Sequence, residues 1–172
     1  MEKIIFEKMS EEDLPMIWQW LAQPHIEKWW KEADDYNVFA DLYRSKMHSD
    51  EVFPFIIYLD GKPIGFIQYY LTDKINNGWW LQHIDWPEKT AGVDLFIGLK
   101  DYIGKGYGTI LLKQFIDEYV LKHPDISTVI LDPQPTNLGA IRCYQKVGFT
   151  EVKHVITPDG PALMMKLTQS GT

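Results

Sequence analysis

The sequence predicts an α+β fold built on a mixed, mostly antiparallel β-sheet, and three observations lead to this class. The first half of the chain shows a hairpin pattern around Asp60-Gly61, the second half shows one strand–helix–strand unit, and a second hairpin surrounds Pro158–Gly160. A chain of 172 residues that is 45% hydrophobic can bury one good core but is short for two domains. We therefore expect a single domain over residues 1–172.

The N-terminal part predicts one short strand followed by two helices. Ile4–Lys8 alternates apolar and polar residues as a strand does. Ser10 and the acidic residues after it form a capping sequence that opens a helix through Leu21, and Pro24 ends this helix. A second helical pattern covers Asn37–Met47, so both helices precede the first hairpin.

The next segment predicts an antiparallel hairpin with a third strand beside it. Val52–Leu59 and Pro63–Leu71 are apolar runs joined by Asp60-Gly61, a turn sequence that accepts left-handed backbone. After a polar break at Asp73–Gly78, the aromatic run Trp79–His83 is expected to form the third strand.

The second half of the chain changes to a strand, a helix and a strand. Val93–Ile97 is typical of a buried strand, Ile110–Tyr119 of an amphipathic helix, and Ser127–Leu131 of a β-branched strand. Two strands joined through a helix pair in parallel. The remaining predicted elements are a helix capped by Asn137 and ended by Gly148, and a hairpin of Thr150–Ile156 with Leu163–Leu167.

The segment between the crossover strand and its helix, Gly104–Thr109, is the most informative motif. Its alternating glycines let backbone N–H groups approach a phosphate, and the helix start adds unpaired donors and a partial positive charge. A plain connection is the alternative, because glycine-rich turns often precede helices. The motif is not a nucleoside-triphosphate loop, since Gly106 follows Lys105 where Ser or Thr is required, and the element pattern is unlike a dinucleotide fold.

Composition limits the kinds of partner. A net charge of −7 and a sequence pI near 5.2 oppose affinity for nucleic acid or anionic membranes and favour a cationic small molecule. One cysteine, Cys143, excludes an internal disulfide, the N-terminus lacks a signal-peptide pattern, and no apolar run reaches the roughly 18 residues of a membrane span. We therefore expect a cytoplasmic protein. No metal site is expected, because the histidines are scattered: His25, His48, His83, His123 and His154.

Aromatic content is high, at 14% with seven tryptophans, four of which form the adjacent pairs Trp29-Trp30 and Trp79-Trp80. Neighbouring side chains on a strand point to opposite faces, so at most one of each pair can easily enter the core. The other could form an apolar wall for a sugar ring or a cation, be partly buried on the surface, or lie in a dimer interface. The sequence leaves a monomer or a homodimer open.

Two segments, Gly104–Gly108 with the helix after it and Asn137–Phe149, resemble the signature segments of the GCN5-related N-acetyltransferases (GNAT). The resemblance implies three α/β layers, with about six to seven strands and helices on both faces of the sheet. It also implies that the glycine loop grips the pyrophosphate of acetyl-coenzyme A. The family's first segment usually begins with Gln or Arg before the first glycine, where this chain has Ile103. One phosphate contact is therefore lost, while the backbone donors and Lys105 remain.

Further segments resemble the aminoglycoside 6'-N-acetyltransferase branch of this superfamily, and the similarity covers most of the chain in the same order. These segments are His25–Trp30, Pro63–Gly65, Gly78–Trp80, Gly92–Asp94, Leu131–Pro133 with Pro135 and Asn137, and Thr157–Pro161. The resemblance implies transfer of an acetyl group from acetyl-coenzyme A to the 6'-amine of an aminoglycoside, without a metal.

The resemblance also assigns catalytic and coenzyme residues. The transfer requires a base for the substrate ammonium and an acid for the departing thiolate. Asp94 is expected to be the base, directly or through a water, and Tyr144 the acid. From the residues alone, Asp94 could instead bond a turn and Tyr144 could pack on the core face of its helix. Coenzyme contacts are expected from Phe96, Ile97, Gly104, Lys105, Gly106, Tyr107, Gly108, Thr109, Asn137, Ala140 and Tyr144.

An aminoglycoside is a polycation with little apolar surface, so its binding requires separated carboxylates and an aromatic face. The expected substrate residues are Trp79, Trp80, Asp94, Asp132 and Asp159. Asp132 could otherwise be a cap or loop residue, and Asp159 a plain turn residue. Asn77 stands where some members of the branch carry an acidic residue. The absence of a carboxylate at this position would narrow the range of drugs accepted.

Together these features predict an acetyl-coenzyme A-dependent N-acetyltransferase that acts on a cationic small molecule, most specifically the 6'-amine of aminoglycosides. Two alternatives stay open. One is an enzyme of the same fold that acetylates another amine, such as a siderophore hydroxylamine or a protein N-terminus. The other is a non-catalytic domain that senses coenzyme A or a cationic ligand, although Asp94 and Tyr144 argue against it.

Overall fold

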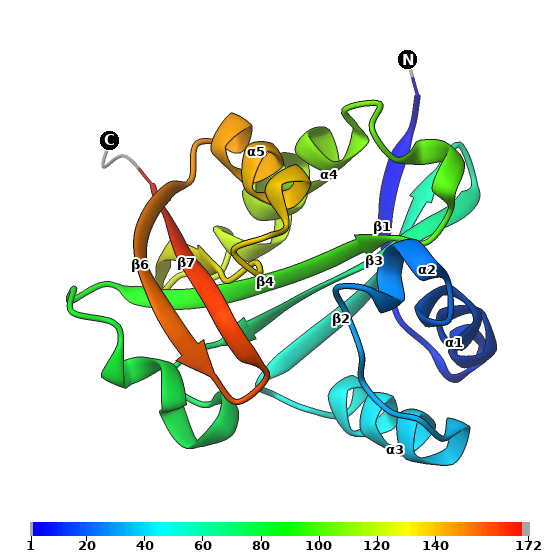
Figure 1. The fold of residues 1–172 in the computed structure, drawn as a ribbon, viewed down its shortest axis with the longest axis horizontal. Helices are drawn as coiled ribbons and strands as arrows, with labels where there is room; N and C mark the ends of the chain where they lie inside the picture. The colour runs from blue at the N-terminus through cyan, green and yellow to red at the C-terminus, as the bar shows by residue number, and fades with distance from the viewer. Residues whose placement is uncertain (1, 170–172) are drawn as a thin grey trace. The chain divides into compact units, whose positions relative to one another are not determined.

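The computed structural model describes residues 2–169, and their strands form one seven-stranded sheet (Figure 1). In the order in which they lie side by side, the strands are β1 (Ile4–Lys8), β2 (Val52–Leu59), β3 (Lys62–Leu71), β4 (Lys89–Ile97), β5 (Ile126–Leu131), β7 (Gly160–Thr168) and β6 (Thr150–Thr157). β4 and β5 pair in parallel, whereas β1–β2, β5–β7 and β6–β7 are antiparallel pairs. The predicted mixed, mostly antiparallel sheet is confirmed.

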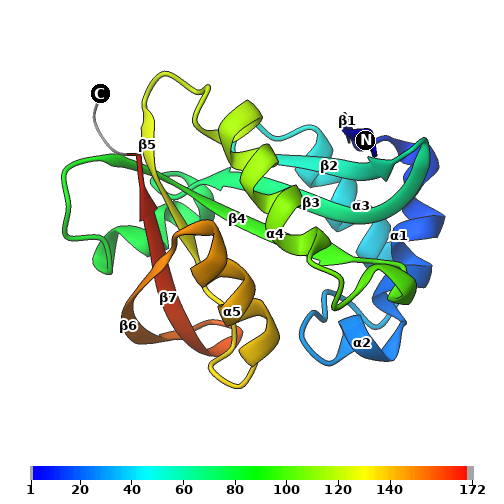
Figure 2. The same cartoon turned by 90° about the horizontal axis from the view of Figure 1, so that it is seen from above.

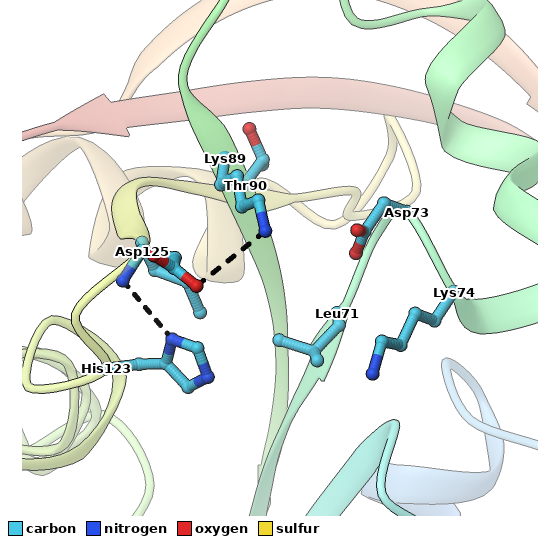
Figure 3. A pocket seen from close by; sticks show the side chains of 8 residues that line it. Leu71, Asp73, Lys74, Lys89, Thr90, His123 and Asp125 are labelled. Carbon is cyan, nitrogen blue, oxygen red and sulfur yellow. Dashed lines mark hydrogen bonds and ion pairs between the residues drawn. The ribbon is translucent and has the colours of Figure 1, made fainter.

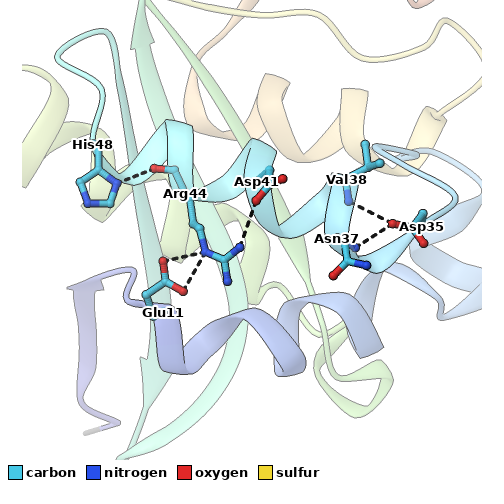
Figure 4. A network of polar contacts seen from close by, with 7 residues as sticks. All are labelled: Glu11, Asp35, Asn37, Val38, Asp41, Arg44 and His48. Carbon is cyan, nitrogen blue, oxygen red and sulfur yellow. Dashed lines mark hydrogen bonds and ion pairs between the residues drawn. The ribbon is translucent and has the colours of Figure 1, made fainter.

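The helices begin and end at residues suited to those places. They are α1 (Leu14–Leu21), α2 (Pro24–Glu27), α3 (Tyr36–Met47), α4 (Tyr107–Phe115), which continues into a π-helical turn at Ile116–Val120, and α5 (Leu138–Val147). Asp35 accepts hydrogen bonds from two backbone N–H groups at the start of α3 (Figure 4). Asn137 does the same for Ala140 at the start of α5, and Gly148 ends α5 with a φ of 115°.

The chain forms two compact units, and strands β3 and β4 contribute residues to both. The first unit contains the chain up to Tyr69 together with Asp94–Lys105, and within it α3 packs against α1 and β2. The second contains Tyr70–Val93 and the chain from Gly106 onward, and within it α4 and α5 lie side by side (Figure 2). Buried core residues include Leu14, Ile17, Phe39, Tyr43 and Phe66 in the first unit and Leu111, Leu112, Phe115, Ile130 and Met164 in the second.

The third strand predicted at Trp79–His83 is wrong, because Ile75–Gln82 forms 3-10 helical turns. Asn76, Asn77 and Gly78 adopt left-handed backbone with φ values of 50°, 55° and 71°. Asparagine and glycine tolerate this conformation, and three such residues in succession curl the chain, which overrides the strand preference of the tryptophans. The strand that lies beside β3 is β4, which starts earlier than the sequence predicts.

Pro24 begins a helix as well as following one. α1 ends at Leu21, and Pro24 occupies the first position of α2, where its missing N–H needs no partner. The short α2 leads into the loop that carries Trp30 and Glu32. Within residues 2–169, every helix is too short or too polar to cross a membrane.

Candidate active site

Asp94 lies on β4, and its carboxylate is held by Gln68 on the neighbouring strand β3. Gln68 Nε2 donates to Asp94 Oδ2 at 2.8 Å. The Gln68 side chain is buried, whereas Asp94 is half-buried and retains some contact with solvent. A hydrogen bond to an ionised acceptor is stronger than one between neutral groups. Gln68 is not among the residues predicted from the sequence, although a glutamine inside the apolar run Ile64–Leu71 is a signal of a buried polar role.

The other end of the Gln68 amide is unsatisfied. Its Oε1 atom is buried, and no hydrogen-bond donor meets it among residues 2–169. A buried carbonyl without a partner costs about 1–3 kcal/mol of stability. Gln68 therefore donates to Asp94 through Nε2, while its buried Oε1 has no hydrogen bond among the described residues to offset the loss of water.

Close to this pair in the first unit, Glu32 collects three polar side chains on one oxygen. Its Oε1 accepts hydrogen bonds from Trp30 Nε1 at 2.9 Å, Tyr43 OH at 3.2 Å and Lys46 Nζ at 2.8 Å. Burial opposes ionisation of Glu32, but the charge of Lys46 and these hydrogen bonds outweigh it, so the pKa of Glu32 is lowered. This cluster was not predicted from the sequence, because its members follow no motif.

Tyr43 connects the Glu32 cluster electrostatically to Asp94. Burial raises the pKa of Tyr43 well above its usual range, and the negative charges of Glu32 and Asp94 raise it further. The phenol therefore stays neutral at ordinary pH and donates its proton to Glu32. Its ring lies 5.7 Å from that of Phe66, whose other neighbours include Trp30 at 5.9 Å. Tyr43 thus links the charge of Asp94 to an aromatic cluster.

The end of β4 is held tightly by its neighbours. A Cβ added to Gly65 on β3 would lie 2.5 Å from the carbonyl oxygen of Phe96, so only glycine permits this approach. His25 Nε2 donates to the carbonyl oxygen of Ile97 at 3.1 Å. Phe96, predicted to contact the coenzyme, buries its side chain in the core, where it stacks on Phe66. Only its backbone is therefore suited to a ligand contact.

The glycine-rich segment has the backbone that its sequence predicts. Gly104 and Gly106 have φ values of 74° and 87°, and a Cβ added to either would meet no atom within 4 Å. Lys105 between them is exposed. α4 follows at Tyr107, and in the described structure no side chain caps its start. These residues can hold a phosphate group through backbone N–H groups and one positive side chain.

The second signature segment forms α5, which packs on α4. Thr109 Oγ1 and Cys143 Sγ are 3.5 Å apart, and a Cβ on Gly108 would lie 3.2 Å from the same sulfur. Burial raises the pKa of Cys143, so this thiol is a packing residue at the contact of the two helices. Tyr144 beside it is half-buried, and its ring lies 6.3 Å from Phe149. Tyr144 belongs to the second unit, whereas Asp94 belongs to the first.

The tryptophans predicted as a substrate wall form an aromatic cluster in the second unit. The rings of Trp79 and Trp80 are 4.9 Å apart, and that of His83 lies 4.7 Å from Trp79. Trp80 is buried and Trp79 half-buried, so one of the pair can offer a face to a ligand. Burial and the charge of Lys153 lower the pKa of His83.

The two predicted substrate carboxylates beyond Asp94 differ in setting. Asp132 is half-buried just after β5. Asp159 is exposed in the turn between β6 and β7, and its backbone N–H donates to Thr157 Oγ1 at 3.1 Å. The backbone of Asp159 thus forms the turn that the sequence allows, and its side chain is exposed to solvent.

A separate hollow of about 230 Å³ lies in the second unit and contains none of the predicted site residues (Figure 3). Lys89 and Asp125 form an ion pair of 3.7 Å at its edge, and the backbone N–H of Asp125 donates to His123. These groups satisfy one another. In the described part of the chain, no three His, Cys, Asp or Glu side chains lie close enough together to hold a metal ion.

Comparison with known proteins identifies relatives over nearly the whole chain. A family model described as an acetyltransferase (GNAT) domain matches residues 9–157. The aminoglycoside N(6')-acetyltransferase type 1 of Klebsiella pneumoniae is 35% identical over 98% of this chain and 84% of its own length. The N(6)-hydroxylysine O-acetyltransferase of Escherichia coli is 22% identical over 85% of this chain and 45% of its own length.

Solved structures give the same result. The aminoglycoside acetyltransferase AAC(6')-Ib, in complex with coenzyme A and kanamycin, matches with a TM-score of 0.86 and 35% identity, over 96% of this chain and 95% of that one. The resemblance of the chain to this superfamily is therefore confirmed. The chain belongs to the GNAT acetyltransferases, in the branch that contains the aminoglycoside N(6')-acetyltransferases.

Proposed function

We propose that this protein transfers the acetyl group of acetyl-coenzyme A to an amine of an aminoglycoside, most specifically the 6'-amine. The observation that carries the proposal is the near full-length similarity to an aminoglycoside N(6')-acetyltransferase. The fold supports it further, because a relative of the same fold binds both coenzyme A and kanamycin. The net charge of −7 suits a polycationic substrate.

The residues present fit the coenzyme. Left-handed glycines at positions 104 and 106 leave open space for a phosphate, and Lys105 adds a positive charge. When bound, acetyl-coenzyme A supplies the acetyl group as a thioester. The backbone of Phe96 and Ile97, together with Asn137 and the residues around it on α5, is proposed to line the rest of the coenzyme site.

Asp94 and Tyr144 are proposed to carry the protons. Asp94 takes one from the substrate ammonium, directly or through a water, which frees the lone pair that attacks the thioester carbonyl. Tyr144 gives its proton to the sulfur as the carbon–sulfur bond breaks, and the proton that the acetylated nitrogen loses restores the phenol. Asp132, Asp159 and the Trp79-Trp80 face are proposed to bind the other amines and the sugar rings of the substrate.

The proposal is tested by release of coenzyme A thiol from acetyl-coenzyme A, with kanamycin, tobramycin, a hydroxylamine and a peptide amine offered side by side. We expect saturable release with the aminoglycosides. Asp94→Asn should lower kcat about 10²- to 10⁴-fold, the usual contribution of a general base. Asp117→Asn, the same change at an exposed ion pair with Lys113, should leave the rate unchanged.

The outcomes separate the parts of this proposal. Turnover of the hydroxylamine alone would assign the chain to the chemistry of the N(6)-hydroxylysine O-acetyltransferase instead. Coenzyme binding without turnover of any amine would indicate a sensor. Full activity of Asp94→Asn would remove Asp94 from the mechanism while leaving the substrate assignment in place.

A further inference from the structure

We propose that Gln68 is a positioning residue that orients the Asp94 carboxylate and holds it in its ionised form, and that its place in the core is kept for this contact and not for stability. The inference rests on the proposed role of Asp94 as the base. It goes beyond that role, because Gln68 belongs to neither signature segment and acts only through Asp94.

The two polar atoms of the Gln68 amide differ in their hydrogen bonding. Nε2 donates to Asp94 Oδ2 at 2.8 Å, whereas Oε1 is buried and meets no donor in the described part of the chain. The reverse orientation of the amide would set its oxygen against a carboxylate oxygen, so a charged Asp94 selects the orientation observed. An apolar side chain of the same length would avoid the unsatisfied oxygen. Among the described residues, the one hydrogen bond of the Gln68 side chain is therefore the one to Asp94.

The surroundings of Asp94 favour such a donor. The negative charge of Asp94 acts on the phenol of Tyr43 on α3, which stays neutral and donates to Glu32, and Lys46 balances the charge of Glu32. By strand alternation, Phe66 shares a face of the sheet with Gln68, and Phe96 shares one with Asp94; the rings of both contact Trp30. A carboxylate beside apolar rings and a second carboxylate is pushed toward its protonated form, and an N–H donor to the ionised form opposes this.

Two variants of Gln68 and one control test the inference in the full-length protein. Gln68→Met keeps the side-chain length and removes both the donor and the unsatisfied oxygen. Gln68→Glu keeps the shape and replaces the donor by a second carboxyl group. The control is Thr72→Val, because Thr72 is also buried but its hydroxyl is satisfied by the carbonyl oxygen of Thr90 at 2.8 Å.

Three quantities are measured: the pKa of Asp94 by carbon-13 NMR titration, the midpoint of thermal unfolding, and the pH profiles of kcat and KM. The NMR signal of Asp94 is assigned by its loss in Asp94→Asn. In Gln68→Met we expect the Asp94 pKa to rise by about one unit and the acidic limb of the kcat profile to move to higher pH by the same amount. At pH values below the Asp94 pKa, kcat should therefore be roughly tenfold lower than in the wild type. KM should change little and the thermal midpoint should not fall. Gln68→Glu should shift the limb further toward alkaline pH. Thr72→Val should lower the thermal midpoint and leave the Asp94 pKa in place.

The inference is overturned if Gln68→Met lowers the thermal midpoint as Thr72→Val does while the Asp94 titration stays unchanged, because Gln68 would then be an ordinary structural residue. Failure of the proposed function looks different. If the wild type acetylates no aminoglycoside, the NMR titration and the thermal midpoint still decide whether Gln68 holds Asp94. If Asp94→Asn is inactive and Gln68→Met is indistinguishable from the wild type, only the role of Gln68 is lost.

Discussion

Two regions of this protein position their functional groups in different ways. Around Asp94, the arrangement depends on side chains that hold one another, with Gln68 on the carboxylate and Glu32 joining a loop to α3. In the glycine-rich segment Gly104–Thr109, the arrangement depends on backbone conformation, and the space beside the left-handed glycines is open. The difference teaches that the segment can lose a side chain, such as the missing polar residue at Ile103, whereas a change near Asp94 affects several partners at once.

The largest effect on stability is expected for Glu32→Gln. This change leaves Lys46, whose side chain is 14% exposed, without its charge partner and weakens the hydrogen bonds from Trp30 and Tyr43. We expect the free energy of unfolding at pH 7 to fall by about 2–4 kcal/mol, somewhat less than the roughly 3–5 kcal/mol of a fully buried pair that loses one partner, because both side chains keep some exposure. Urea unfolding measures it. A loss no larger than that of Asp117→Asn, which breaks an exposed pair, would show that the cluster contributes little.

The same cluster predicts how stability depends on pH. The pKa of Glu32 is lowered in the folded state, so its contribution is fully present above the unfolded value of about 4.3 and is lost as pH falls through the folded value. The wild type should therefore lose its advantage over Glu32→Gln on acidification below about pH 4.3. Unfolding curves of both proteins from pH 7 to pH 3 measure the difference. A constant difference over this range would contradict the assignment.

Two glycine substitutions compare the regions directly. In Gly65→Ala the new Cβ would lie 2.5 Å from the carbonyl oxygen of Phe96, so β3 or β4 must shift, and we expect a loss of about 1–3 kcal/mol in stability together with a lower kcat. In Gly106→Ala the Cβ meets nothing, and the cost of about 1 kcal/mol comes from the left-handed φ alone. The KM for acetyl-coenzyme A should rise several-fold with kcat unchanged at saturation. Equal effects of the two changes on kcat and KM would contradict the distinction between the packed end of β4 and the open glycine-rich segment.

How far the sequence alone could lead follows from the same contrast. The hairpins, the parallel crossover and the glycine segment depend on neighbours in sequence, and turn residues and periodicity predicted them. The contact of Gln68 with Asp94 joins residues 26 apart, and Glu32 meets Lys46 at a separation of 14, so no local pattern marks either pair. The strand predicted at Trp79–His83 fails for a local reason, since the Asn76-Asn77 pair before Gly78 favours left-handed turns more strongly than the tryptophans favour a strand. The roles of all the predicted site residues, Asp94 and Tyr144 included, stay predictions.

The smallest effect is expected where polar side chains meet in solvent. Arg44 on α3 donates from Nε to both carboxylate oxygens of Glu11 at 2.9 and 3.0 Å and pairs with Asp41 at 3.1 Å (Figure 4). All three side chains are about half-exposed or more, so water screens the attraction that at Glu32 is protected by burial. Arg44→Gln should shift the urea midpoint only slightly in low salt and not at all in 1 M NaCl, where charges are screened within about 3 Å. The loss in Glu32→Gln should persist in the same salt, because burial and not the number of contacts determines what an ion pair contributes.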